Sequence, residues 1–279
     1  MQVNLLALGG GTETTMTAQT RIALLQAQCI VGAARLIERL PAECTQNRAA
    51  ATKPQKILEA LRAANCDRAA VVYSGDTGFY SGCRDLVPLL EEQGIAYTVF
   101  PGISSVQLMA AALHRPWQDW TLVSAHGVQC DAVAAVLQGK PTFFLTGGSL
   151  GVPQLCKQLT EAGLGDLAVT VGENLSYPDA SVRTGRAAEM AKQDFGPLCV
   201  LLTEAVQQPP RRSPGWPDTW FERGKVPMTK RFVRAAAIAA LGIQPEDVLW
   251  DVGAGTGSVS VELAAAAQKG SVYAVECEL

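Results

Sequence analysis

The chain has 279 residues, of which 48% are hydrophobic, and a formal net charge of −3. This length and composition support one large or two ordinary globular domains with a real apolar core. The longest apolar run, residues 235–243, is far shorter than the roughly 18–20 residues that span a bilayer. The small net charge gives no general attraction to nucleic acid or anionic lipid. We therefore expect a globular protein with no membrane or nucleic-acid partner.

The N-terminus and the cysteines bear on compartment and metal binding. Residues 3–8 (Val-Asn-Leu-Leu-Ala-Leu) are strand-like, and no basic segment with an apolar signal core precedes them. The eight cysteines are widely spaced, form no Cys-x-x-Cys pair and accompany only two histidines. This pattern is typical of buried or incidental thiols in a reducing compartment. We expect a cytoplasmic protein without a metal site.

Short apolar runs rich in Val, Ile and Leu alternate along the chain with longer amphipathic stretches. This alternation is typical of β–α units around a largely parallel sheet, and it predicts an α/β fold. Helices are expected between the strands. The predicted strands lie at residues 3–8, 28–32, 69–74, 96–100, 120–124, 141–146, 168–173 and 197–203.

Two interruptions divide this pattern into parts. Residues 206–217 are rich in proline and have no apolar periodicity, which is typical of a linker. Residues 114–119 break the alternation nearer the middle and indicate a short hinge between two lobes, where ligands often bind. The predicted parts are lobes at about 1–114 and 118–205, a linker at 206–222 and a further domain at 223–279.

Turns with glycine or serine follow three of the predicted strands. Gly9-Gly10-Gly11 follows the first strand, residues 75–82 (Gly-Asp-Thr-Gly-Phe-Tyr-Ser-Gly) follow the third, and Ser104-Ser105 follow the fourth. Open α/β sheets bind ligands at the carboxyl ends of their strands, and glycine allows close backbone approach. The alternatives are an ordinary tight turn for the glycine cluster and helix capping for Asp76 and the serines. The occurrence of all three turns together favours a ligand site.

The most informative motif lies near the C-terminus. Residues 251–257 (Asp-Val-Gly-Ala-Gly-Thr-Gly) follow the apolar run 248–250 and precede a helical run. A second predicted strand ends in Glu276, where an acid can accept hydrogen bonds from both ribose hydroxyls. A nicotinamide-binding turn shares this spacing, but residues 256–257 (Thr-Gly) and 227–230 (Pro-Met-Thr-Lys) favour a methylase. The half-site expected here for an adenosyl group consists of Asp251, Gly253, Gly255 and Glu276.

Taken together, these motifs resemble those of the tetrapyrrole methylases. The resemblance in the first 205 residues rests on four ordered segments: Leu8-Gly9-Gly10-Gly11, 74–80 (Ser-Gly-Asp-Thr-Gly-Phe-Tyr), 101–105 (Pro-Gly-Ile-Ser-Ser) and 124–127 (Ser-Ala-His-Gly). Residues 172–179 (Gly-Glu-Asn-Leu-Ser-Tyr-Pro-Asp) resemble the branch that methylates carbon 5 of the corrin precursor. Residues 224–230 and 250–259 resemble its usual fusion partner, the carbon 15 methyltransferase and decarboxylase. The resemblance covers nearly the whole chain.

The resemblance implies a fold and a cofactor. The fold would be a two-lobed methylase, with two α/β/α subdomains and the cofactor cleft between them, followed by the start of a Rossmann-like class I methyltransferase domain. The cofactor would be S-adenosyl-L-methionine, and its methyl transfer is a direct displacement that needs positioning but no metal. No catalytic acid or base stands out. The implied cofactor-binding residues are Gly9, Gly75, Asp76, Gly78, Phe79, Ser104, Ser105 and Thr146.

The substrate implied by the resemblance is a small tetrapyrrole with several carboxylates, which cations near the cleft are expected to bind. The candidates are Arg84, Arg115 and His126, because each lies in or next to a loop expected at the cleft. The alternatives are solvated surface arginines and a turn-stabilising histidine.

The activity implied is methylation of precorrin-6B at carbon 5 in cobalamin biosynthesis, by a homodimer. Carbon 15 methylation and decarboxylation would need a complete second domain. Because only two of about seven expected strands follow the linker, we expect this segment to be truncated and unable to catalyse. The alternatives are a methylase of another tetrapyrrole or of a protein side chain, an inactive cofactor-binding subunit, or a C-terminal tail with exposed apolar surface.

Overall fold

A computed structural model describes residues 1–127, 129–206, 214–224 and 226–277. Its contacts divide the chain into a first unit, Met1–Gln207, and a second unit, Gln208–Leu279. Residues 207–213 of the predicted linker and Lys225 of the motif at 224–230 lie outside the described residues.

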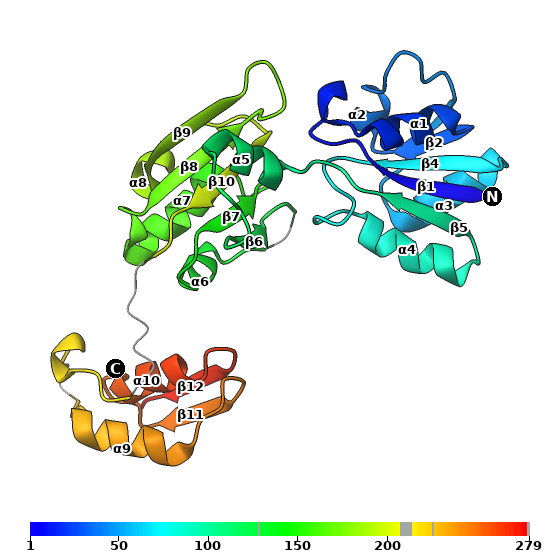
Figure 1. Cartoon of the computed structure of the whole chain (residues 1–279). Helices are drawn as coiled ribbons and strands as arrows, with labels where there is room; N and C mark the ends of the chain where they lie inside the picture. The colour runs from blue at the N-terminus through cyan, green and yellow to red at the C-terminus, as the bar shows by residue number, and fades with distance from the viewer. Residues whose placement is uncertain (128, 207–213, 225, 278–279) are drawn as a thin grey trace. The chain divides into compact units, whose positions relative to one another are not determined.

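The first sheet of the first unit is parallel throughout, with strand order β3-β2-β4-β1-β5. Its apolar strand residues alternate between two helical layers, as strands buried on both faces require. Figure 1 shows α1 and α2 on one face and α3 and α4 on the other. The strands are β1 (Gln2–Ala7), β2 (Cys29–Gly32), β3 (Asn47–Ala50), β4 (Arg68–Tyr73) and β5 (Ala96–Phe100). The helices are α1 (Ala18–Gln26), α2 (Ala34–Ile37), α3 (Pro54–Ala64) and α4 (Cys83–Glu92), with a 3-10 turn at Glu13–Thr15.

The second sheet of the first unit is mixed, with strand order β6-β7-β10-β8-β9. β6 and β7 are parallel, but β10 is antiparallel to both β7 and β8, and β9 is antiparallel to β8. The expectation of a largely parallel sheet is therefore wrong for this half, where β10 runs against both of its neighbours and the short connection between β8 and β9 permits only an antiparallel pair. The strands are β6 (Thr121–Ser124), β7 (Thr142–Leu145), β8 (Ala168–Glu173), β9 (Ser181–Arg186) and β10 (Cys199–Thr203).

The helices around the second sheet show where the chain passes between the sheets. On one face, α5 (Ser105–Leu113) buries Met109 in a cluster with Phe143 and Trp120. Because α5 packs with the second sheet, the chain crosses between the sheets at residues 101–104, ahead of the predicted hinge at 114–119. The other face is covered by α6 (Ala132–Val136), α7 (Val152–Leu159) and α8 (Ala187–Met190), and a π-helical turn at Thr160–Leu164 follows α7.

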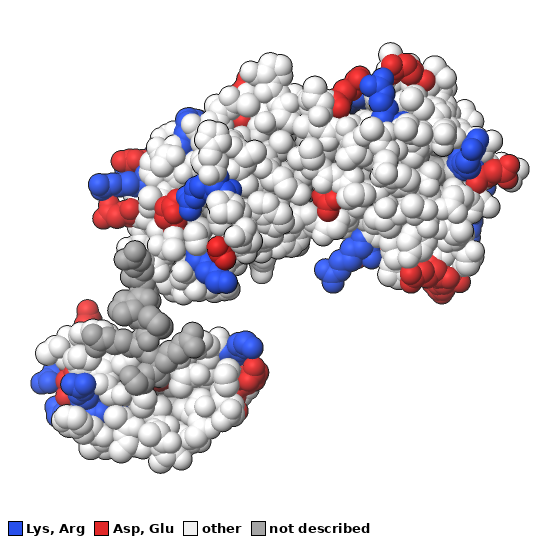
Figure 2. Space-filling model, viewed as in Figure 1, with Lys and Arg blue, Asp and Glu red and all other residues white. Residues whose placement is uncertain are grey.

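All strands predicted within residues 1–205 are present, with bounds that agree to within two residues, whereas β3 and β9 were not predicted. Within the described part of the chain, no helix is long and apolar enough to cross a membrane. The same residues contain no group of three or more His, Cys, Asp or Glu side chains that could hold a metal ion. On the face of the first unit seen in Figure 2, charges of both signs occur in small mixed groups.

The second unit has a parallel pair of strands, β11 (Val248–Val252) and β12 (Ser271–Val275). Helix α10 (Ser258–Ala266) packs against these strands and against α9 (Arg231–Leu241), and a 3-10 turn at Asp218–Trp220 precedes α9. One face of the pair is exposed, and on it the Trp250 and Tyr273 rings stack with centroids 4.9 Å apart.

Candidate functional site

A cavity of about 340 Å³ lies in the first unit, where loops from both sheets meet. Loops following β1, β4, β7 and β8 contribute to its wall, together with the first residues of α5 and the residues ahead of β10. The sequence motifs of the first 205 residues therefore converge on one cavity. The main wall segments are 8–13, 73–75, 79–82, 104–105, 145–146, 174–177 and 197–200.

Gly9 and Gly75 join the loops that follow β1 and β4. The Gly9 N–H donates to the Gly75 carbonyl (3.2 Å), and the Gly75 N–H donates to the Gly9 carbonyl (2.7 Å). Both residues have left-handed backbone, with φ of +71° and +70°, which favours glycine. A Cβ at Gly9 would overlap the Thr15 carbonyl. The backbone itself therefore forms this part of the wall.

Asp76 links two loops by hydrogen bonds and does not line the cavity. One carboxylate oxygen, Oδ1, accepts from the Gly78 N–H (2.8 Å), and the other, Oδ2, accepts from the Gly102 N–H (2.8 Å). Neither Asp76 nor Gly78 lines the cavity, whereas Phe79 does. Asp76 also does not cap α4, whose N-cap residue is Gly82. Its observed contacts position the loop that carries Gly75 and Phe79.

The two serines at the start of α5 differ. Ser104 is the N-cap of α5 and forms a capping box with Gln107, whose Oε1 accepts from the Ser104 N–H (2.9 Å). Both serines line the cavity. The Ser105 hydroxyl is buried and has no hydrogen-bond partner in the described chain. Because a buried hydroxyl without a partner is costly, Ser105 is suited to bind a ligand.

Thr146 and His126 also line the cavity. The Thr146 hydroxyl donates to the Cys199 carbonyl (2.5 Å), and the His126 Nδ1 lies 3.3 Å from the Thr146 carbonyl oxygen. Tyr73 adds a second buried hydroxyl without a partner in the described chain. Burial, with smaller effects of Cys83 and Asp85, raises the pKa of Tyr73, so its phenol stays neutral.

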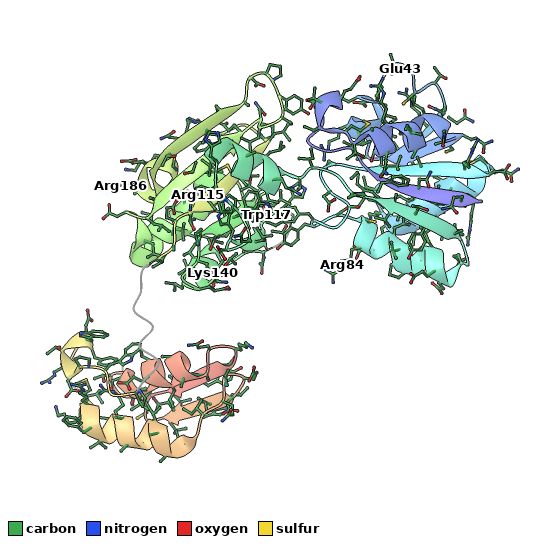
Figure 3. All side chains as sticks on the ribbon, in the orientation of Figure 1. Glu43, Arg84, Arg115, Trp117, Lys140 and Arg186 are labelled. Carbon is green, nitrogen blue, oxygen red and sulfur yellow. The ribbon has the colours of Figure 1, made fainter. Side chains whose placement is uncertain are left out.

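The two arginines predicted from the sequence do not line the cavity. Arg115 makes a bidentate ion pair with Glu204, with N–O distances of 2.5 and 3.2 Å. The hydrogen bond to Glu204 raises the pKa of Arg115. Arg84, near the start of α4, extends away from its helix (Figure 3). Of the three predicted substrate-binding residues, the structure brings only His126 to the cavity.

Sequence reasoning missed two cations and two residues of a covering loop. Arg35 and Arg39 both line the cavity. In the loop after β8, the Ser176 hydroxyl donates to the Gly10 carbonyl (2.6 Å), and Tyr177 accepts from Arg39 (3.1 Å). In the sequence, Ser176 and Tyr177 are marked only by the resemblance of residues 172–179 to the carbon 5 methylases. The signal for Arg35 and Arg39 was their position just after β2, at the carboxyl edge of the sheet.

In the second unit, the predicted residues lie in and around one turn. The Gly255 N–H donates to Glu276 Oε2 (2.6 Å), and the Gly253 N–H donates to the Val275 carbonyl (2.8 Å). Asp251 accepts from the Ser260 hydroxyl (2.5 Å). The Thr256 hydroxyl is buried and has no partner in the described chain. The glycine-rich turn thus joins β11 to α10 beside the end of β12, as the sequence predicts.

Glycine-lined loops at strand ends around a cavity of this size define a small-ligand-binding α/β protein. Residues 2–191 match the model of a family described as "Tetrapyrrole (Corrin/Porphyrin) Methylases". The chain belongs to this family. Residues 219–279 match a second model, described as "Precorrin methyltransferase domain".

Curated proteins are similar to this chain over part or most of its length. The chain is similar to a "Precorrin-6Y C(5,15)-methyltransferase [decarboxylating]" of Sinorhizobium sp, with 33% identity over 69% of this chain and 47% of the relative. It is also similar to a protein of the same name from Mycobacterium tuberculosis (strain CDC 1551 / Oshkosh), with 30% identity over 91% of this chain and 64% of the relative. The chain thus spans about half to two thirds of the length of these relatives. A segment of 69 residues is similar to a "Probable cobalt-precorrin-6B C(15)-methyltransferase (decarboxylating)" of Pyrobaculum calidifontis, with 54% identity over 24% of this chain and 35% of the relative.

Solved structures share the two-lobed fold of the first unit. The precorrin-6Y methylase CbiE from Archaeoglobus fulgidus aligns with a TM-score of 0.59 and 19% identity, covering 74% of this chain and 98% of that chain. A uroporphyrin-III C-methyltransferase from Thermus thermophilus, in complex with S-adenosylhomocysteine, aligns with a TM-score of 0.60 and 21% identity, covering 73% and 92%. The two-lobed α/β fold expected from the sequence is confirmed.

Proposed function

We propose that the first unit transfers a methyl group from S-adenosyl-L-methionine to carbon 5 of precorrin-6B, also called precorrin-6Y, in cobalamin biosynthesis. The observation that carries this proposal is the convergence of the loops after β1 and β4 and the start of α5 on one cavity. The names of the Sinorhizobium and Mycobacterium relatives support the choice of substrate.

The residues of the cavity fit an adenosyl cofactor. Gly9 and Gly75 have no side chain at the cavity wall, which allows close approach of a ligand to their backbone. The buried hydroxyl of Ser105, a residue that lines the cavity, lacks a partner in the described chain and is suited to bind a polar group of a ligand. When bound, the cofactor supplies an electrophilic methyl group. The residues proposed to hold it directly are Gly9, Gly75, Phe79, Ser104, Ser105 and Thr146, with Asp76 and Gly78 shaping the loop.

The proposed contribution of this chain to the reaction is positioning. Ser176 and Tyr177, from the loop after β8, contact the carbonyls of Gly10 and Gly11 and so cover the glycine turn. Excluding water and aligning two reactants can supply a large part of a methyl transfer's rate enhancement. His126 lines the cavity and contacts the Thr146 carbonyl oxygen through Nδ1. We propose that it binds the substrate and transfers no proton.

For the second unit, we propose an adenosyl half-site formed by Asp251, Gly253, Gly255 and Glu276. The match of residues 219–279 to a precorrin methyltransferase domain and the similarity to the Pyrobaculum protein support this assignment. The hydrogen bond from the Gly255 N–H to Glu276 fixes the carboxylate at the turn. Methylation at carbon 15 with decarboxylation is then the activity of the domain type to which this unit is similar.

Mass spectrometry of the corrin product tests the first-unit proposal. The chain is incubated with precorrin-6B and S-adenosyl-L-methionine, and the mass of the product is measured. One added methyl group without loss of carbon dioxide is the expected result. Two methyl groups with decarboxylation would mean that the second unit is also active, and an unchanged mass would contradict the proposal.

Methylation of another tetrapyrrole is the second candidate, favoured by the structural similarity to the uroporphyrin-III methyltransferase. Competition between precorrin-6B and uroporphyrinogen III for the same enzyme separates the two. Preferential turnover of uroporphyrinogen III would support the second candidate.

A homodimer in the cytoplasm is also part of the proposal, by resemblance to the family. Light scattering during size-exclusion chromatography tests the dimer, with a single-chain mass as the contradicting result. Cell fractionation tests the location.

A further inference from the structure

We propose that Arg35 and Arg39 form a subsite for the carboxylates of the substrate at the cavity wall. The inference rests on the proposed function, because it assigns a place for a polycarboxylate in the same cavity. Arg35 belongs to α2, and Arg39 lies in the turn after this helix, where its N–H donates to the Leu36 carbonyl (3.2 Å).

Both guanidinium groups face parts of the cavity wall. An Arg35 nitrogen, Nη2, donates to the Ser74 hydroxyl (3.2 Å), and an Arg39 nitrogen, Nη1, donates to the Tyr177 hydroxyl (3.1 Å). All four residues line the cavity. Arg39 lies two residues beyond the end of α2, so both arginines reach the cavity from one short segment of chain. The two arginines can thus meet neighbouring carboxylates of one ligand.

The charge of these arginines is not balanced by carboxylates of the protein. Neither Arg35 nor Arg39 makes an ion pair with an Asp or Glu in the described part of the chain. The carboxylate of Glu13, which also lines the cavity, pairs with Arg21 at 3.4 Å. Hydroxyl partners leave most donors of each guanidinium available, and arginine binds carboxylates in a bidentate manner. The cavity wall therefore contains two guanidinium groups that are available to bind an anionic ligand.

The substrate fits these cations better than the cofactor does. S-adenosyl-L-methionine carries one carboxylate next to its own ammonium group, whereas a corrin precursor carries several carboxylates around its rim. Arg39 also contacts Tyr177, from the loop that covers the glycine turn. A carboxylate bound by Arg39 would therefore lie beside this covering loop.

Binding of precorrin-6B to variants of the full chain tests the proposal by calorimetry, with S-adenosylhomocysteine titrated separately. The variants are Arg35→Gln, Arg39→Gln, the double variant and Arg39→Lys. Arg62→Gln is the matched control, because Arg62 is an exposed arginine on α3 that contacts the Gln93 side chain and does not line the cavity. Each Gln variant should raise the Kd for precorrin-6B about tenfold, and the double variant more. Arg39→Lys should recover part of the loss, and the Kd for S-adenosylhomocysteine should stay within about twofold.

The outcomes separate this inference from the proposed function, because turnover is measured on the same samples. Unchanged precorrin-6B binding in the double variant would overturn the subsite, even where the unaltered chain methylates the substrate. Weakened S-adenosylhomocysteine binding with unchanged precorrin-6B binding would assign the arginines to the cofactor and also overturn it. If the unaltered chain binds precorrin-6B without methylating it, the proposed function fails and the variants still decide the subsite. An unaltered chain that does not bind precorrin-6B would contradict both.

Discussion

The two glycine-rich turns of this chain, Gly9–Gly11 and Gly253–Gly257, differ in what surrounds them. A Cβ at Gly10 would lie 2.7 Å from Ser176 Cβ, and a Cβ at Gly11 would lie 2.5 Å from the Tyr177 hydroxyl. At Gly253 and Gly257, an added Cβ would meet no atom within 4 Å. The first turn is enclosed by a loop more than 160 positions away, whereas in the second only the central Gly255 has close neighbours among the described residues, Val226 and Pro227. A glycine motif therefore specifies the backbone of a site, and distant segments decide whether the site is enclosed.

The interiors of the two units also differ, in how much apolar packing each contains. The first unit is built on apolar clusters that cover both faces of each sheet. In the described part of the second unit, the fully buried Arg234 pairs with Glu262 (2.5 Å) and Asp218 (3.2 Å) and donates to the carbonyls of Thr229 and Trp216 (both 2.6 Å). The buried apolar residues in the described part of the second unit are Met228, Ile238, Leu263 and Ala267. The second unit depends on a polar network where the first depends on apolar packing.

The largest expected effect comes from breaking that network. Arg234→Met should destabilise the second unit by about 3–5 kcal/mol, because it leaves the buried Glu262 carboxylate without its cation. Hydrogen exchange of peptides covering α9 and α10 measures the loss of protection. Lys269→Met, which removes an exposed pair with Glu246, is the control and should change stability by less than about 1 kcal/mol. Full protection of α9 in Arg234→Met would show that the network does not support the unit.

A matched pair of glycine substitutions tests the difference in surroundings. Gly9 and Gly253 both have left-handed backbone, with φ of +71° and +80°. Alanine at either position should therefore cost about 1 kcal/mol in backbone strain. Gly9→Ala also overlaps the Thr15 carbonyl and should cost about 1–3 kcal/mol more, with a large loss of S-adenosylhomocysteine affinity. Urea unfolding and calorimetry measure both effects, and equal losses in the two variants would contradict the comparison.

The unpartnered hydroxyls of the two units allow a finer test. Ser105→Ala should weaken S-adenosylhomocysteine binding about five- to tenfold, because it removes one hydrogen bond to the ligand. Thr256→Val, in the turn of the second unit, should leave the affinity of the first-unit site unchanged. Titration calorimetry compares the two, and a loss confined to Thr256→Val would place the main binding site in the second unit.

The smallest expected effect is a pH dependence of the free energy of unfolding of the first unit at acid pH. Burial opposes ionisation of Glu173, but hydrogen bonds from the Gly196 N–H and from Arg183 outweigh it and lower the pKa of Glu173 below its ordinary value of 4.5. A lowered pKa in the folded state stabilises the fold above pH 4.5, and this contribution is lost as the pH falls toward the folded value. Glu173→Gln should therefore cost about 1 kcal/mol at pH 7 and less near pH 4. Urea unfolding at both pH values checks this, and a pH-independent difference would contradict it.

The sequence predicted those features that are local. Buried strands such as β4 are continuous apolar runs, and the turns after β1, β4 and β11 are marked by glycine. The edge strand β9 (Ser-Val-Arg-Thr-Gly-Arg) is mostly exposed and has no apolar run to detect. The antiparallel direction of β10 could not be predicted either. A strand that is buried on both faces has a continuous apolar sequence whichever way it runs.

Features that depend on distant contacts could not be predicted. Arg115 was expected to bind substrate, but its partner Glu204 is 89 positions away. Asp76 was a candidate ligand or cap, yet its second partner lies in the loop after β5. Arg35 and Arg39 became candidates only when the fold brought Ser74 and Tyr177 beside them.

Hydrogen exchange of the full chain with and without S-adenosylhomocysteine tests the central claim, that the first unit holds the adenosyl cofactor. The account predicts increased protection in residues 8–16, 74–82 and 104–108, whether or not residues 251–257 are also protected. Protection of residues 251–257 with no change around Gly9, Gly75 and Ser105 would contradict it.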